Sequence, residues 1–218
     1  MSTEDFSLAM QLRCAYFRRI SECCTCGYRF RSNSDLDCLS HMLTCPHNTY
    51  GYRERHEEVV REQLLCIKRF SLNTIHEPKM FSAAEVDTRP DYVVLLPRIS
   101  PVIDVTVVTN IAISHRDNTN CTETASRDKV SKHGEAVSSK GAYKFFPIAV
   151  EASGHCHSNL DELIALLSRE LTTRDTKPFR RAFCFATSTG LQRGNVRILK
   201  HAYARLAAAS TFGTRAWV

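Results

Sequence analysis

Two aspartates lie in or beside the most apolar stretches of the chain. Asp91 opens the run DYVVLL, and Asp104 lies inside the run PVIDVTVV. An ionised carboxylate is costly to bury among valine and isoleucine unless a cation meets it, and paired carboxylates combined with phosphate oxygens are the ligands that Mg²⁺ prefers. The two aspartates therefore predict a Mg²⁺ site suited to phosphate chemistry. The alternatives are a turn role for Asp91 and a solvent-facing position for Asp104.

A second group of residues with metal chemistry lies near the N-terminus, where six of the ten cysteines fall within the first 45 residues. Cys23 and Cys26 form a C-x2-C pair, which is followed after fourteen residues by His41 and Cys45 in an H-x3-C pair. Four such ligands suit tetrahedral Zn²⁺ and leave no position open for water, so the zinc would be structural. Three nearby residues of the same types are alternative ligands: Cys24, Cys38 and His47. The remaining alternative is a loop of reduced, free cysteines.

Several motifs together resemble a known family. They are RPDYVV, the twelve residues between Asp91 and Asp104, the following DVTVV, a downstream helix that carries lysines, and FFPIAVEASG. The combination resembles the PD-(D/E)XK restriction-like endonuclease domain, and within it the endonuclease that follows the reverse transcriptase in site-specific non-LTR retrotransposons. In that branch a CCHC zinc knuckle precedes an Arg-His helix, and here the Cys/His residues precede Arg55 and His56. The resemblance covers roughly residues 23–171.

The resemblance implies roles for individual residues. Asp91 and Asp104 would hold a catalytic Mg²⁺ or Mn²⁺ that activates water and stabilises charge on the scissile phosphate. The family's usual lysine, two positions after the second acid, is replaced here by Thr106. In this branch the lysine moves to the following helix, where Lys129 and Lys132 lie three residues apart and so share a helical face. Either could orient the attacking water or stabilise the phosphate, although each is also explained as a solvated helix residue.

Two further residues are weaker candidates for the same site. Glu151, at the end of a predicted strand, could add a carboxylate, and His56 could approach the acids from the preceding helix. Both are also explained as structural or surface residues.

The charge of the chain is moderately basic. A net charge of +6 and a pI near 8.8 favour attraction to phosphate backbones without establishing it. In a nuclease, basic residues near the site and in the C-terminal segment would supply the phosphate contacts. The candidates are Arg53, Arg55, Lys177, Arg180, Arg181 and Arg193.

The strands that must position the two aspartates follow from short β-rich runs. Residues 91–96 and 101–108 are separated by a turn with Pro and Ser, so they predict neighbouring antiparallel strands that bring both acids to one edge of a sheet. Residues 144–152 predict a third buried strand, interrupted near its start by Pro147. A short extended piece is expected at 74–78.

Helices are predicted where apolar residues recur with a period near 3.6. Ser158 is the expected N-cap of one of them, whose leucines form an apolar stripe that should cover a sheet face. An amphipathic helix is also a candidate within residues 1–22. The helix that follows Ser158 is predicted over residues 159–171, and the other predicted helices span residues 52–70, 123–140 and 195–209.

These elements predict an α/β (α+β) fold, with a mixed central sheet flanked by helices and a small N-terminal zinc knuckle; the resemblance implies a restriction-endonuclease-like core. With 218 residues, the chain can form one domain of ordinary size with appendages. The expected divisions are an N-terminal helix or arm at 1–22, the knuckle at 23–48, the nuclease core at 49–175 and a basic helical tail at 176–218.

The leading functional hypothesis is a retrotransposon-derived, metal-dependent endonuclease acting on DNA, with RNA as the alternative substrate. A second class is an inactive nucleic-acid-binding remnant that keeps the fold and the zinc; Thr106 in place of lysine favours it, as does the lack of the reverse-transcriptase module found in related proteins. A ribonuclease or repair nuclease on the same fold is a third. Short apolar runs and the polar start MSTEDF predict a soluble intracellular protein, nuclear or cytoplasmic, without a membrane span.

Overall fold

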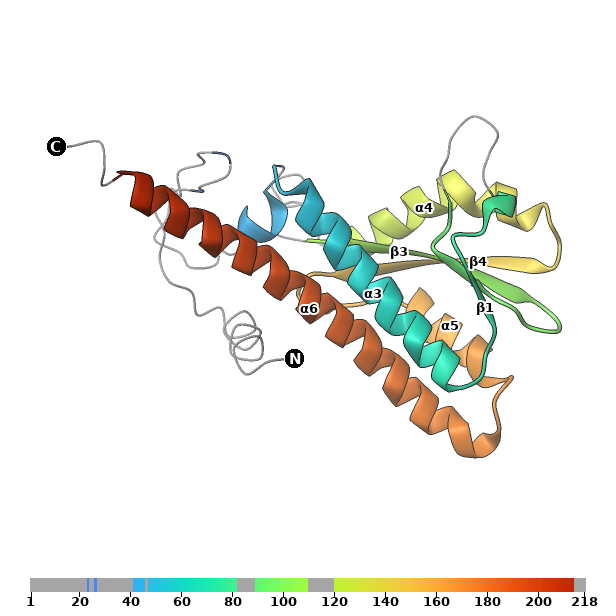
Figure 1. The fold of residues 1–218 in the computed structure, drawn as a ribbon. Helices are drawn as coiled ribbons and strands as arrows, with labels where there is room; N and C mark the ends of the chain where they lie inside the picture. Colours follow the sequence, from blue (N-terminus) through green and yellow to red (C-terminus); the bar gives the residue numbers. More distant parts are fainter. Residues whose placement is uncertain are drawn as a thin grey trace.

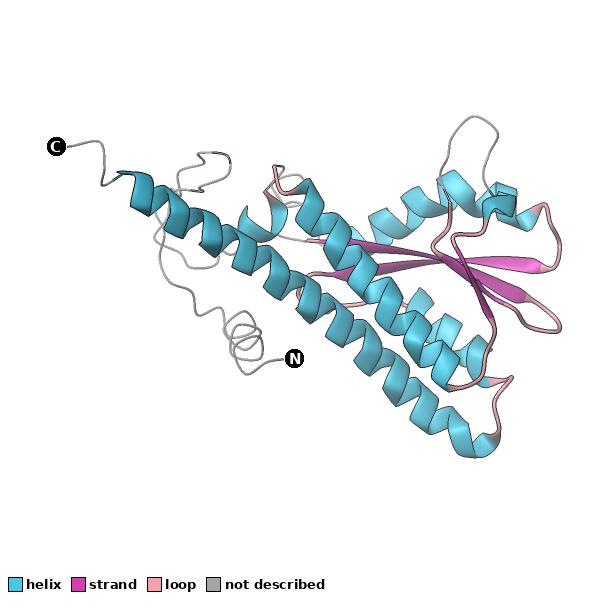
Figure 2. Ribbon diagram, in the orientation of Figure 1, coloured by secondary structure: helices cyan, strands magenta, loops and turns pink. Residues whose placement is uncertain are grey.

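The computed structural model describes residues 23, 26, 41–45, 47–81, 89–109 and 120–213. The helix predicted within residues 1–22, and the alternative ligands Cys24 and Cys38, lie outside these residues. The principal elements, in chain order, are α3 (Thr49–Arg69), β1 (Thr74–His76), η1 (Lys79–Phe81), β2 (Tyr92–Val94), β3 (Ser100–Val108), α4 (Cys121–Ser138), β4 (Tyr143–Glu151), α5 (Asn159–Ser168) and α6 (Thr173–Gly213) (Figures 1 and 2).

The strands form one four-stranded mixed sheet in the order β1-β2-β3-β4. The pairs β1/β2 and β2/β3 are antiparallel, and β3/β4 is parallel. The parallel pair requires a crossover connection, which contains α4. The predicted fold class is therefore confirmed as a mixed α/β fold whose sheet is flanked by helices. The predicted antiparallel neighbours are confirmed too, with Tyr92 opposite Ile103.

The third strand is confirmed, but the prediction that Pro147 interrupts it is wrong. Pro147 is buried within the continuous strand β4 and stands opposite Asp104 in the register. A proline is tolerated there because β4 lies at the edge of the sheet, where one side of the strand has no ladder to complete. The Pro147 carbonyl accepts a hydrogen bond from Asn159 Nδ2 at 3.0 Å, which ties this edge to the start of α5.

The alternation of side chains along the strands places a different layer on each face of the sheet. Tyr92, Ile103 and Ile148 belong to a core shared with α3, α5 and α6. Val102 on the opposite face packs in a smaller cluster with Val137 of α4. Asp104 alternates with Ile103, so its side chain lies on the α4 face of the sheet.

Helix α6 lies antiparallel to α3 along most of the length of α3 and extends beyond it (Figure 1). Hydrogen bonds join Arg55 to Asn195 and Gln63 to Thr187. A Cβ atom added at Gly190 would lie 2.6 Å from the Glu58 carbonyl oxygen. Glycine is therefore required there because the two backbones approach too closely for any side chain.

The helix α6 differs from the prediction of a helix limited to 195–209. It is one continuous helix of 41 residues, with Pro178 inside its second turn. Its apolar residues recur at helical spacing, and Phe179, Phe183 and Leu191 enter the same core as the sheet. The expected boundary between core and tail at 175/176 consequently falls inside α6, and the first half of the expected tail packs as part of the core.

The helix α5 confirms the predicted leucine stripe, since Leu160, Leu163, Ile164 and Leu167 are all buried. Ser158 occupies the N-cap position, but its side chain makes no capping hydrogen bond. Its backbone carbonyl instead accepts from the N–H groups of Asp161 and Glu162. Among the helices of the described residues, none combines the length and the apolar character needed to cross a membrane.

Candidate functional site

Asp91 lies just before β2 and is held by two elements. Its backbone N–H donates to the Ile103 carbonyl at 2.9 Å, and its Oδ2 accepts from the Val105 N–H at 2.6 Å. From α3, His56 Nε2 lies 3.1 Å from the same Oδ2. Burial alone would lower the pKa of His56, but the hydrogen bond to Asp91 and the charge of its carboxylate raise it above its ordinary value. The Asp91 carboxylate is thus fixed between β3 and α3.

Asp104 is buried in the middle of β3 and faces α4. Lys129 Nζ lies 2.9 Å from its Oδ1, and His133 Nε2 lies 3.3 Å from its Oδ2. Burial raises the pKa of the Asp104 carboxyl; the Lys129 ammonium opposes this shift, and the charge of Asp91 adds to it. The Asp91 carboxylate accepts from the N–H of Val105, the residue that follows Asp104 in β3, so the two aspartates are neighbours at this point of the sheet; we call them the acid pair below.

The structure distinguishes between the two candidate lysines. Lys129 contacts Asp104, whereas Lys132 on the next turn is exposed. His133 was not a candidate from the sequence, although it follows Lys129 by four residues and so shares its helical face. This spacing was the available signal. Burial lowers the pKa of His133, which favours the neutral imidazole beside Asp104.

The acid pair has the chemistry of a Mg²⁺ site. Among the described residues, none donates a hydrogen bond to the buried Oδ2 of Asp104, because His133 is close but not aligned. An unpartnered buried carboxylate oxygen is an acceptor that a cation could satisfy. Mg²⁺ is commonly held by one or two protein carboxylates and completes its shell with water and phosphate oxygens. Asp91 and Asp104 therefore fit this ion.

Glu151 does not join the acid pair. It stands opposite Val108 in the parallel register, whereas Asp104 stands opposite Pro147, and four residues of strand correspond to about 13 Å. Its carboxylate contacts Cys121 Sγ at 3.4 Å and Ser153 Oγ at 2.9 Å. Glu151 thus fastens the end of β4 to the start of α4.

An open cavity of about 410 Å³ adjoins the acid pair. Its lining includes Tyr52, Arg55 and His56 of α3, residues 105–109 of β3 and its end, and Lys129 of α4. Thr106, which replaces the expected lysine, belongs to this lining. Because His56 and Lys129 contact Asp91 and Asp104 respectively, the cavity reaches the partners of both acids. We call it the acid-pair cavity.

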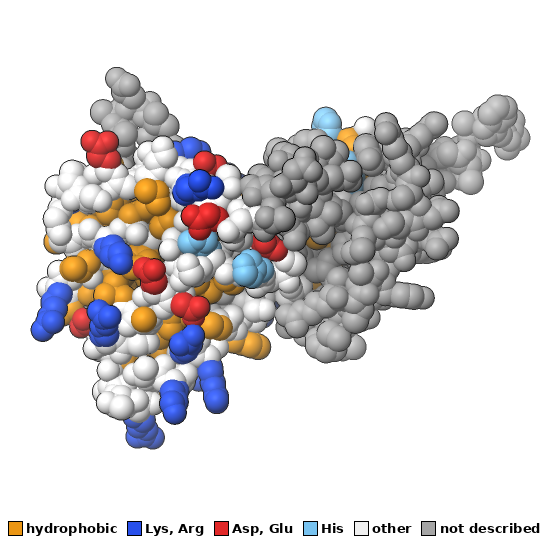
Figure 3. Space-filling view, turned by 180° about the vertical axis from the view of Figure 1, so that it is seen from behind, with side chains coloured by type: hydrophobic (Ala, Val, Ile, Leu, Met, Phe, Trp, Pro, Cys, Tyr) orange, Lys and Arg blue, Asp and Glu red, His pale blue; other side chains and the backbone are white. Residues whose placement is uncertain are grey.

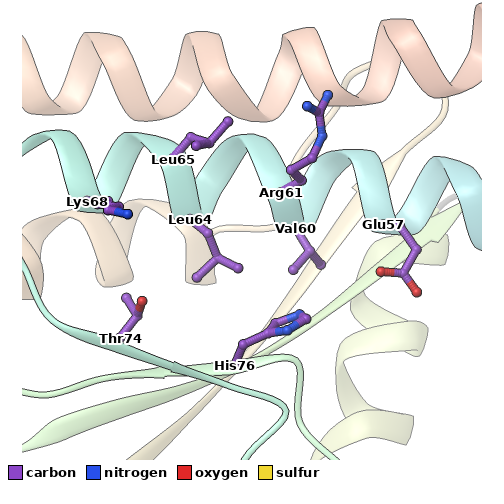
Figure 4. A pocket seen from close by; sticks show the side chains of 8 residues that line it. All are labelled: Glu57, Val60, Arg61, Leu64, Leu65, Lys68, Thr74 and His76. Carbon is purple, nitrogen blue, oxygen red and sulfur yellow. The ribbon is translucent and has the colours of Figure 1, made fainter.

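A second hollow, of about 370 Å³, lies between α3 and β1. Figure 4 shows Val60 and Leu64 pointing from α3 towards β1, which carries Thr74 and His76. Neither aspartate of the acid pair lines it. Its apolar floor and mixed rim distinguish this hollow from the acid-pair cavity.

The predicted zinc ligands converge in space. The ligand atoms of Cys23, Cys26, His41 and Cys45 all lie within 4.8 Å of one another. Cys26 Sγ is 3.1 Å from His41 Nε2, and Cys23 Sγ is 3.9 Å from Cys45 Sγ. We call these four residues the Cys/His cluster, and it could hold a metal ion such as structural zinc. The alternative ligand His47 is exposed and does not belong to it.

The Cys/His cluster is attached to the start of α3. Tyr52 Oη donates to the Cys45 carbonyl at 2.5 Å. A small hollow between the cluster and α6 is lined by Cys23, Cys45 and His201. Burial raises the pKa of the Cys45 thiol to about 12. Because metal binding requires thiolates, uptake of an ion would release protons.

Five of the six basic residues expected to bind nucleic acid fall into two groups. Arg53 and Arg55 lie near the start of α3, whereas Lys177, Arg180 and Arg181 lie near the start of α6. Since the helices are antiparallel and Asn195 marks the level of Arg55, fourteen residues of α6 separate the groups, about 21 Å. Figure 3 shows several Lys and Arg side chains projecting from one end of the described part of the molecule.

Ion pairs already engage several of these residues. Arg193 pairs with Glu62 across the α3/α6 contact, Arg180 pairs with Asp161 at 2.9 Å, and Arg53 pairs with Glu57 at 3.5 Å. Lys177 and Arg181 are exposed, and Arg55 is buried. The six basic residues therefore do not form one continuous binding surface.

No model of a known protein family matches this chain, and no curated protein sequence matches it. The functional assignment consequently depends on the residues and geometry of the acid pair and of the Cys/His cluster.

Proposed function

We propose that the protein is a metal-dependent endonuclease that hydrolyses phosphodiester bonds in DNA and descends from the retrotransposon endonucleases that it resembles. The observation that carries the proposal is the convergence of Asp91, Asp104 and Lys129, which come from the residue before β2, from the adjacent strand β3 and from the crossover helix α4. Two carboxylates and a lysine beside an open cavity are what the resemblance predicts for the catalytic group, with the lysine supplied by α4 in place of Thr106.

In this proposal each residue has a distinct task. Asp91 and Asp104 would hold Mg²⁺ or Mn²⁺, which supplies Lewis acidity and an activated water at neutral pH. His56 and the Val105 N–H keep the Asp91 carboxylate in one orientation. Lys129, partly exposed and lining the acid-pair cavity, would present its ammonium to a phosphate oxygen and stabilise the negative charge that develops there.

We propose Zn²⁺ as the occupant of the Cys/His cluster, in a structural role. Four ligands of the Cys₃His type leave no open coordination position for catalysis. Tyr52 of α3 donates to the Cys45 carbonyl, so an ion that holds Cys45 would also fix the start of α3. The positions of Arg55 and His56, on the same part of α3, would be fixed with it.

A second candidate function is nucleic-acid binding without turnover. It is favoured by the direct contact of Lys129 with Asp104, since an ammonium that neutralises a carboxylate competes with a metal ion for the same carboxylate group. In that case the acid pair would be a structural remnant, and the basic residues would still bind phosphate.

Nicking of supercoiled plasmid with Mg²⁺ or Mn²⁺ tests the proposal. We expect the wild type to nick the plasmid and Asp104→Asn to lose this activity. Asp128→Asn is the matched control, because Asp128 is an exposed aspartate on α4 that adjoins Lys129 in sequence. Equal nicking by the wild type and Asp104→Asn would show that the acid pair is not catalytic, and absence of nicking with retained DNA binding would favour the second candidate.

A further inference from the structure

Arg55 is an unusual arginine because it is buried without a counter-charge among the described residues. The residue is only 4% exposed to solvent. Its Nη1 donates to Asn195 Oδ1 at 3.2 Å, and its guanidinium lies 5.6 Å from the centre of the Tyr52 ring. Both partners are neutral. In the part of the chain that the structure describes, no carboxylate pairs with Arg55, and its buried Nε has no hydrogen-bond acceptor.

A buried guanidinium without a counter-charge has an unfavourable desolvation free energy. Burial lowers the pKa of Arg55 to about 10, which still leaves it protonated at neutral pH. Buried charges in proteins are normally paired or meet a ligand. Arg55 has no ion-pair partner within the ranges that the structure describes and is not exposed, which indicates that an anion belongs beside it.

The surroundings of Arg55 fit an anion. Arg55 lines the acid-pair cavity together with His56 and Lys129, so three side chains that can carry positive charge border one space. Among the described residues that line this cavity there is no aspartate or glutamate. Its volume of about 410 Å³ lies within the range of roughly 300–1,000 Å³ of pockets that hold small organic ligands.

We propose that the acid-pair cavity binds a phosphodiester group of the DNA backbone adjacent to the one that is cleaved, with Arg55 as its counter-charge. The identity of the polymer rests on the proposed function, whereas the anion site rests on Arg55 and the cavity alone. Arginine suits this task because its planar fork can donate two hydrogen bonds to one phosphate. A phosphate bound there would lie beside the acid pair and fix the register of the strand.

The first test measures binding without cleavage. The affinity for a fluorescein-labelled DNA duplex is followed by anisotropy over a range of salt concentrations, with no divalent metal added. Each phosphate contact contributes about 0.9 to the slope of log K against log salt. We expect Arg55→Met to reduce the magnitude of this slope by about that amount and to weaken binding roughly tenfold. Arg69→Met is the control, because it removes an exposed arginine from the far end of α3.

The second test uses inorganic phosphate as the probe. The melting temperature of the wild type should rise more in phosphate than in chloride of equal ionic strength, and Arg55→Met should lose this difference. An equal rise in both proteins would reflect the general exclusion of phosphate from protein surfaces and would overturn the proposal. The wild-type measurement remains decisive if Arg55→Met fails to fold, since absence of a phosphate-specific rise also overturns it.

The two proposals can fail separately. If the wild type does not nick plasmid but Arg55→Met changes the salt slope, the nuclease proposal fails and the phosphate site stands. If nicking is metal-dependent but Arg55→Met and Arg69→Met have the same slope, the phosphate site fails alone. Binding of inorganic phosphate with no duplex binding by the wild type would overturn the assignment to a phosphodiester.

Discussion

The ammonium of Lys129 lies 2.9 Å from Oδ1 of Asp104, although the two residues belong to different elements and 25 positions separate them in the chain. The crossover from β3 through α4 to β4 makes this contact possible, because it returns α4 across the face on which Asp104 lies. A lysine two positions after Asp104 would share its strand face. Lys129 places the positive charge that such a lysine would supply beside the Asp104 carboxylate, but from helix α4 and not from the strand itself.

We expect the replacement Lys129→Met to lower the rate of plasmid nicking by about 100-fold, the usual effect of removing one group that stabilises transition-state charge. Lys132→Met should change the rate less than about twofold, because surface substitutions away from a site have small effects. Single-turnover nicking rates, measured with the metal in excess, compare the two variants. Equal losses in both variants would argue for general DNA attraction in place of a catalytic contact.

The sequence could single out Asp91 and Asp104 as candidates because one opens an apolar run and the other lies inside a run of valine and isoleucine, where charged residues are conspicuous. It could not choose between Lys129 and Lys132, because residues three apart share a helical face and the rotation of α4 about its axis depends on packing. In the structure α4 places Val137 in the smaller core. It also turns His133 towards Asp104, a contact for which the four-residue spacing from Lys129 was the only sign.

Removal of metal from the Cys/His cluster should destabilise the protein. We expect elemental analysis of the purified protein to find stoichiometric zinc. Chelation should lower the melting temperature by roughly 5 °C or more, because an ion that binds only the folded state contributes its binding free energy to stability. His41→Ala should reproduce the fall. His47→Ala should not, because His47 is exposed and outside the cluster. Full stability of the zinc-free protein would contradict the structural role.

Glycines at the α3/α6 contact should be sensitive to the addition of a single methyl group. A Cβ at Gly194 would lie 2.5 Å from the Arg55 Cα, so Gly194→Ala should force the helices apart and cost about 1–3 kcal/mol. Gly134→Ala in α4 is the control. There the Cβ would meet only the Val130 side chain, at 3.2 Å, and the gain in helix propensity is up to about 1 kcal/mol. Urea unfolding should therefore give changes of opposite sign, and equal changes would contradict the close approach.

The same glycines explain why α6 was not predicted as one helix. Gly190, Gly194 and Pro178 all have low helix propensity, so a prediction from local sequence divides the segment. In the structure the glycines permit close packing on α3, and the burial of Phe179 and Phe183 in the core stabilises the helix beyond its propensity. The sheet and α3 were easier to predict, because their apolar periodicity agrees with the tertiary structure.

A buried chain of hydrogen bonds links β2, the strand that follows Asp91, to helices α3 and α6. Tyr92 Oη donates to Gln63 Oε1 at 2.9 Å, and Gln63 Nε2 donates to Thr187 Oγ1 at 3.0 Å. Gln63→Leu leaves the buried Tyr92 hydroxyl without its acceptor and should cost about 1–3 kcal/mol. Tyr92→Phe should cost less in the Gln63→Leu background than alone, with a coupling energy of about 1 kcal/mol in urea unfolding.

Gln192→Leu is the matched control for Gln63→Leu, because it is the same change on the same helix pair at a buried position. Gln192 Oε1 has no hydrogen-bond partner among the described residues. Replacing a buried amide whose oxygen is unsatisfied by an apolar side chain of similar size removes the desolvation penalty of that oxygen, so this variant should be neutral or more stable. Two outcomes would show that the hydrogen-bonded chain does not determine how β2 is joined to the helices. One is additivity of Gln63→Leu and Tyr92→Phe within about 0.5 kcal/mol. The other is a loss of stability in Gln192→Leu equal to that in Gln63→Leu.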